Sequence, residues 1–389
     1  MNRRPSIKRR GSVLLIVLVT MVFATFALTM FIEKAGNDLL VDIREADAGR
    51  LRPEAYSALE TTLGVLEDFR IIGNGLHSPA EGWGDPLGFA GYTPLQEGHT
   101  VEVTLEDESA KLPLASVKPE MLVELLKYWQ VSQNDAERLA DCLMGWIKKD
   151  YVPVSTGAPR PEDYESAPLA YDPPGRSLRS FSELSAIEGV RQAFFDEAGR
   201  PNALYQHFIE TFSLYRYSAP NINGNRLEPL LAQNIYDEQQ QRRVTEYLTG
   251  AGTYQTQGPG FFKTTRTVAA VAGGQPEKLG YGTTVQALRI RVTVREGRSS
   301  FQLTAVVAPQ GGAKVVPASN VTVQDATSNT GTATASPPAT NTPPAQTTQS
   351  QTGPATAVTP PPELNYPFTF LEIRENDMPV STSAAPTES

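Results

Sequence analysis

The chain has 389 residues, enough for one large domain or two ordinary ones with tails. It contains 43 acidic and 34 basic residues, and five of the basic ones precede Ser12, so residues 12–389 carry a net charge of −14. A body of this charge repels nucleic acid, and we expect no nucleic-acid partner. The single cysteine, Cys142, excludes an intrachain disulfide, and its apolar helical surroundings indicate a packing role.

The N-terminus joins a basic run to a long apolar segment. Ser12 to Ile32 gives 21 uncharged residues, which as a helix span about 30 Å, the thickness of a bilayer's hydrocarbon core. The preceding positive charges favour a cytoplasmic N-terminus and place the remainder across the inner membrane. A secretory signal peptide fits poorly, because the apolar run is long and no A-x-A triplet follows it. A membrane anchor that is not cleaved also accounts for the length and hydrophobicity of this segment.

Helix and strand patterns follow in a fixed order. Residues 33–72 predict a helical stem and an amphipathic helix, and residues 73–98 a Gly- and Pro-rich loop. Alternating Val101, Val103 and Leu105 predict a strand, and Ala287–Ala308 a hairpin around "EGRS". Between them six short amphipathic helices are expected, at 118–129, 133–149, 180–195, 202–212, 226–233 and 237–248.

This order predicts an α+β fold, in which a long N-terminal helix packs on an antiparallel sheet and a large all-helical domain is inserted after the first strand. Residues 326–362 contain no charge and no aromatic residue and predict a disordered linker, whereas the alternating "YPFTFLEIRE" beyond it predicts a strand at the sheet edge. The predicted segments are a leader (1–11), a transmembrane helix (12–32), the stem and amphipathic helix (33–72), a loop and first strand (73–112), the helical insert (113–250), strands (251–310), the Thr/Pro/Ala/Ser-rich linker (311–362) and a C-terminal strand and tail (363–389).

Several stretches together resemble one family. A basic leader ending in Gly11 before a long apolar helix resembles the precursors of type IV pilins and type II secretion pseudopilins. Further resemblance to GspK-type minor pseudopilins lies in "LEDESAKLPL", "LADCLMGWIKKD", "RPEDYESAPLAYDPP", "SFSELSAIEGV" and "APNINGNRLEPLLA", in this order. The resemblance implies cleavage by prepilin peptidase between Gly11 and Ser12. Ile16 occupies the fifth mature position, where most of this class carries Glu. The absence of this Glu is compatible with a place at the pilus tip.

The resemblance also implies a calcium site. Carboxylate-rich loops suit this cation, and the family's pattern points to Asp150, Glu162 and Asp163. Lys148 stands where that pattern has an Asp, so an exposed charged loop without metal is an equal alternative. No other cofactor is expected.

No catalytic constellation is recognisable, because His77, His99 and His207 are far apart and form no metal-binding motif. Gly189 in "AIEGV" has the character of a helix-hairpin-helix turn, or of a simple helix C-cap. We therefore expect no enzyme.

The function implied by the resemblance is that of a minor pseudopilin of the type II secretion system, which caps the pseudopilus tip and helps initiate its assembly. Its partners would be the I- and J-type minor pseudopilins, with the body in the periplasm. The alternatives are a minor pilin of a type IV pilus, or an uncleaved, membrane-anchored periplasmic binding module.

Overall fold

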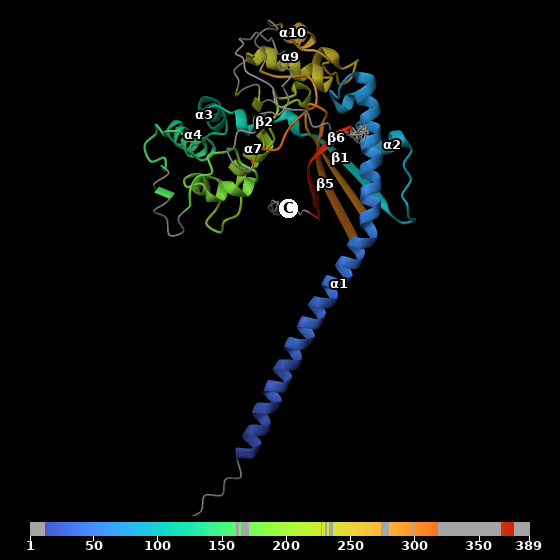
Figure 1. Cartoon of the computed structure of the whole chain (residues 1–389), viewed down its shortest axis with the longest axis vertical. Coiled ribbons are helices and arrows are strands. Elements are labelled where there is room, and N and C mark those ends of the chain that lie inside the picture. Colours follow the sequence, from blue (N-terminus) through green and yellow to red (C-terminus); the bar gives the residue numbers. More distant parts are fainter. Residues whose placement is uncertain are drawn as a thin grey trace, which may run out of the picture.

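The computed structural model describes residues 12–160, 163–164, 171–226, 228–229, 232, 236–273, 280–297, 299–317 and 367–376, with only the backbone of 12–13 and 40–48. Helix α1 (Ser12–Gly73) dominates the architecture (Figure 1). Its first part extends away from the body, and its second part lies along a sheet. The predicted linker at 326–362 and the leader at 1–11 lie outside the described residues.

Helix α1 continues through Pro53, where the sequence predicts a change from stem to amphipathic helix. Proline removes one backbone donor from a helix interior. Leu51 and Ala55 are nevertheless fully buried against the sheet on either side of it, and so are Ala58 and Leu66 further on. Burial of this stripe offsets the lost hydrogen bond and keeps the helix continuous.

The sheet has the strand order β1-β4-β5-β6, all antiparallel. Its strands are β1 (Thr100–Asp107), β4 (Leu288–Glu296), β5 (Ser299–Pro309) and β6 (Phe368–Glu375). On β4, Leu288, Ile290, Val292 and Val294 point toward α1 and are buried, as the alternation predicts. The expected hairpin and the expected C-terminal edge strand are both confirmed.

The helical insert lies between β1 and β4. It contains α3 (Pro119–Tyr128), α4 (Gln133–Ile147), α6 (Val190–Phe194), α7 (Ala203–Thr211), α9 (Glu238–Thr249) and α10 (Thr265–Ala272), with the 3₁₀ segments η2 (Glu108–Ala110), η3 (Leu114–Ser116), η4 (Phe181–Ala186), η5 (Ile222–Gly224) and η6 (Gly252–Tyr254). Two cores separate within it: one spans Leu112 to Ala232, and a smaller one joins α9 and α10 around Phe262. In Figure 1 the two groups lie to one side of the sheet and above it.

The fold class predicted from the sequence is confirmed, and four local expectations differ. The segment predicted as a loop contains η1 (Pro79–Glu81) and α2 (Pro86–Ala90), each begun by a side-chain cap from Ser78 or Asp85. Helix α10 lies within the segment expected to hold only strands. The two-residue strands β2 (Leu112–Pro113) and β3 (Phe212–Ser213) pair within the expected all-helical insert.

The fourth difference concerns Gly189, which is the N-cap of α6 and not a helix C-cap. Its φ is +82°, and a Cβ there would lie 2.9 Å from Cys142 Sγ. The position therefore requires glycine for both conformation and space. Cys142 itself is buried in the insert core, as expected.

Candidate assembly surface

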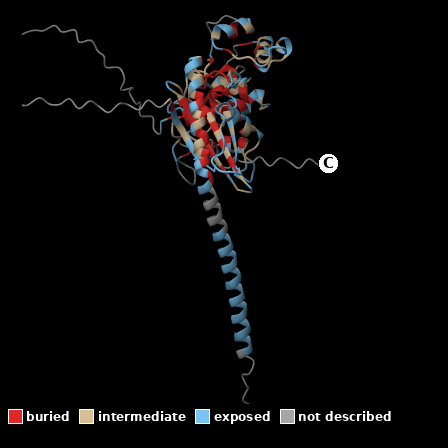
Figure 2. Ribbon diagram, turned by 90° about the vertical axis from the view of Figure 1, so that its right-hand side faces the viewer, coloured by how far each residue is buried: buried red, intermediate tan, exposed pale blue. Residues whose placement is uncertain are grey.

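The exposed apolar part of α1 is the most prominent surface of the chain. Leu14 is 78 % exposed, Ile16 58 % and Phe23 70 %, and Figure 2 shows this part of the helix exposed along its length. Leu14–Leu39 is long and apolar enough to cross a membrane. Each hydroxyl of Thr20, Thr25 and Thr29 donates to a carbonyl of the preceding helical turn, so none of these groups is left unsatisfied in an apolar environment.

The predicted processing site adjoins this surface. Gly11 lies outside the described residues, and Ser12 is the first residue of α1. Cleavage between them stays a prediction. Ile16 projects from the first turns of the helix, where a carboxylate in its place would be costly to bury among apolar helices.

Where α1 enters the body, a buried carboxylate joins it to the chain before β1. Glu54 accepts hydrogen bonds from the Tyr92 hydroxyl at 2.5 Å and from the backbone N–H of Leu95 at 2.9 Å, and its Oε2 lies 3.2 Å from His99 Nδ1. Burial, and secondarily the bond to Glu54, raises the pKa of Tyr92 to about 12. Tyr92 is therefore a donor at neutral pH, and these contacts fix the helix against the sheet.

A second ionic cluster lies where the insert leaves the sheet. Glu108 is 1 % exposed, and its Oε2 lies 3.1 Å from both Lys111 Nζ and Arg289 Nη2. Glu106 lies 3.1 Å from Lys111 and 3.0 Å from Arg226. These five residues, which we call the junction cluster, come from β1, the segment that follows it, β4 and the chain before α9, so they join the insert to the sheet.

The asparagines of "APNINGN" complete this junction. Asn221 Nδ2 donates to His77 O at 3.0 Å and to Asp107 Oδ2 at 2.7 Å. Asn223 donates to Phe262 O and Thr283 O and accepts from Phe262 N–H. Both side chains are buried and satisfy backbone groups that would otherwise lack partners. This motif, one of those that carry the family resemblance, is therefore a structural element.

Burial, opposed by the donors Ser109 and Asn221, raises the pKa of Asp107 from 3.8 to about 6. The folded state then holds this proton more tightly than the unfolded chain, so the contribution of Asp107 to stability is present below pH 4 and is lost as the pH rises to about 6. We expect Asp107→Asn to abolish this loss, up to about 3 kcal/mol between pH 4 and 7. Urea unfolding across that range measures it, with Glu102→Gln at an exposed site as control; parallel pH profiles for Asp107→Asn and the parent would contradict it.

Two of the three residues predicted to bind calcium, Asp150 and Asp163, lie within the described part of the chain. Asp150 is exposed, Asp163 Oδ2 accepts the Arg160 backbone N–H at 2.7 Å, and Glu162 lies outside the described residues. Among the described residues, no group of three metal-binding side chains occurs. These observations do not support a fit to calcium, and the site stays an untested prediction.

The carboxylate that organises this loop is Asp141, which sequence reasoning missed. It accepts hydrogen bonds from the Tyr151 hydroxyl and from the backbone N–H groups of Val154 and Ser155, at 2.5, 2.8 and 2.6 Å. These donors lower its pKa although burial opposes them. The signal available in the sequence was an aspartate on the apolar face of α4, since such a residue needs partners when buried.

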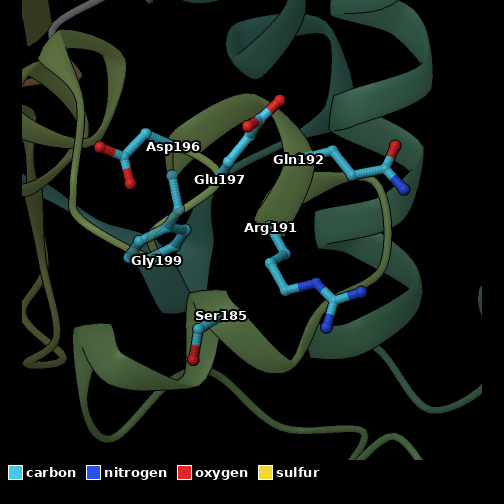
Figure 3. A pocket seen from close by; sticks show the side chains of 7 residues that line it. Ser185, Arg191, Gln192, Asp196, Glu197 and Gly199 are labelled. Carbon is cyan, nitrogen blue, oxygen red and sulfur yellow. The ribbon is translucent and has the colours of Figure 1, made fainter.

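A surface depression lies on the insert (Figure 3). It has a volume of about 500 Å³ and is lined by Ser185, Arg191, Gln192, Phe195, Asp196, Glu197 and Gly199. Asp196 already pairs with Arg200 at 2.9 Å, and the Ser185 hydroxyl donates to Ser182 O. The lining contains neither His nor Cys. Within the described residues His77 binds Glu81, His99 lies against Glu54, and His207 stacks on Trp129.

The fold and the exposed helix define the class: an α+β protein, with a long N-terminal helix that is apolar in its first part and packs on an antiparallel sheet in its second, and with a helical insert after the first strand. Residues 104–200 match the family model described as type II secretion system (T2SS), protein K. This match confirms the resemblance seen in the sequence.

One solved structure is the crystal structure of the GspK-GspI-GspJ complex from enterotoxigenic Escherichia coli. It is similar over 70 % of this chain and 94 % of that chain, with 17 % identity and a TM-score of 0.47. A comparison with curated proteins finds no match.

Proposed function

We propose that the chain is a GspK-like minor pseudopilin that caps the pseudopilus tip of a type II secretion system and helps initiate its assembly. The observation that carries this proposal is the protein K match on the insert of a chain whose apolar helix is exposed. The role is mechanical: α1 packs with neighbouring helices, and the insert at its far end hinders addition of a further subunit. No catalysis by this chain is required.

The arrangement of charges supports one orientation in the membrane. Five basic residues precede the apolar helix and favour a cytoplasmic N-terminus, which places the sheet and insert in the periplasm. The GspK of the solved complex is bound to GspI and GspJ, and we propose I- and J-type minor pseudopilins as partners here as well. Prepilin peptidase would act on the cytoplasmic side.

The first test is the N-terminus and intact mass of membrane-extracted protein from cells with and without prepilin peptidase. We expect a chain that begins at Ser12, with an N-methyl group, only where the peptidase is present. A chain that retains residues 1–11 in peptidase-positive cells would exclude both pilin-class functions and favour an uncleaved anchored binding module. A cleaved chain encoded among pilus genes would favour the type IV minor pilin instead.

A further inference from the structure

Strand β5 is unusually apolar for a strand that would lie at the edge of the sheet if only β1, β4 and β5 were present. Its six consecutive residues Leu303–Ala308 are all buried, on both faces of the sheet. Such continuous burial is typical of a central strand. The hairpin alone, with β1 beside β4, would leave β5 at the sheet edge, where an apolar strand recruits other strands.

Strand β6 covers this edge, although no short turn requires it to do so. A tight antiparallel connection needs two to five residues, whereas 58 residues separate Pro309 from Phe368. The two strands pair over seven positions, from Leu303–Glu375 to Pro309–Phe368, with a register shift between Val306 and Val307. The connection in the chain therefore does not determine which strand pairs with β5, and the pairing depends on the interactions at the β5 edge itself.

The contacts of β6 are those of a bound peptide more than of a core strand. Phe368 is its only fully buried side chain, and Phe370 and Ile373 are 45 % and 46 % exposed. Leu371 packs against the cluster around Tyr215, and two carboxylates supply further specific contacts. Glu372 accepts from the Tyr215 hydroxyl, and Glu375 accepts from Arg52 Nε and the Tyr56 hydroxyl, both at 2.8 Å.

We propose that the edge of β5 is a strand-binding site and that β6 is its tethered, exchangeable occupant. The site accepts an extended peptide that carries an aromatic residue followed by carboxylates four and seven positions later, matching Phe368, Glu372 and Glu375. Main-chain hydrogen bonds supply affinity and the three side chains supply register, as in β-strand addition. This inference does not depend on the proposed role in secretion.

The test uses the full chain in detergent, with a recognition sequence for a site-specific protease inserted after Gln349. Cleavage after folding converts β6 from a tethered to a free ligand, which removes the high effective concentration supplied by the tether. A fluorescent peptide of residues 367–376 is then added in excess. We expect saturable anisotropy binding to the cleaved protein, with release of the fragment, and at least tenfold weaker binding to the uncleaved protein.

Two controls separate exchange from non-specific adsorption. The double variant Thr304→Cys/Arg374→Cys joins directly opposed residues of β5 and β6, and its oxidised, cleaved form is expected to bind no peptide. A peptide with Phe368→Ala is expected to bind roughly tenfold more weakly, because it loses the buried aromatic side chain. Equal binding to cleaved, uncleaved and disulfide-linked protein would show that the peptide adsorbs elsewhere, and no release of the fragment after cleavage would show that β6 is a permanent strand. Either result would overturn the proposal.

Discussion

Gly224→Ala is expected to destabilise the protein by about 3 kcal/mol or more, because Gly224 lies against Ala110 at the junction of sheet and insert. A Cβ at Gly224 would lie 2.0 Å from the Cβ of Ala110, far inside contact distance. Gly224 has no positive φ, so the cost is steric and not conformational. Chemical unfolding of the parent and the variant measures it.

The reciprocal substitution provides a matched control. Ala110→Gly removes the methyl group that Gly224→Ala would strike, and alone it should cost about 1–2 kcal/mol. The double variant Ala110→Gly/Gly224→Ala carries the same number of atoms as the parent and should recover most of the stability lost by Gly224→Ala. The coupling energy of this double-mutant cycle is the decisive quantity. Additive effects of the two changes would contradict the steric explanation.

Glu108→Ala is expected to cost about 3 kcal/mol. The buried carboxylate neutralises Lys111 and Arg289, and removal of one partner of a buried ion pair leaves the other charges uncompensated in a poorly solvated site. Glu106 lies within reach of both cations and limits the damage. Thermal and chemical unfolding monitored by circular dichroism report this loss.

Glu102→Ala on the same strand is the control, since the partners Glu102 and Arg295 are each 54 % exposed. An exposed pair of this kind contributes about 0–1 kcal/mol. Salt should weaken the effect of Glu102→Ala and leave that of Glu108→Ala nearly unchanged, because screening acts mainly on exposed charges. If both substitutions cost the same, the junction cluster does not stabilise the fold through a buried charge.

The sequence was sufficient for those elements whose pattern is local. The uncharged run after Gly11 predicts a long exposed apolar helix, and alternation along Ala287–Ala308 predicts a hairpin, because side chains repeat with the period of the element that buries them. The order of these patterns also predicts a helical insert between the first strand and the hairpin. Short elements begun by caps, such as α2, were missed because five residues are too few to show a period.

Contacts between segments that are far apart in the chain could not be predicted from local sequence patterns. Glu108 and Lys111 read in sequence as ordinary surface charges, and only the return of β4 brings Arg289 to them. Likewise, nothing near Ala110 indicates that Gly224 lies against its methyl group. Asp141 is a further case, because only the folded loop after α4 brings the Tyr151 hydroxyl and the Val154 backbone N–H to its carboxylate.

The sequence by itself determined the long apolar N-terminal helix, the class of fold and the family resemblance, because hydrophobic periodicity and motif order are properties of neighbouring residues. The tertiary structure alone decided which charges are buried, where glycine is obligatory, and that β6 closes the edge of β5 across 58 intervening residues. The physical reason is that burial and the partners of a polar group depend on segments far apart in the chain, and no local pattern records which of them meet.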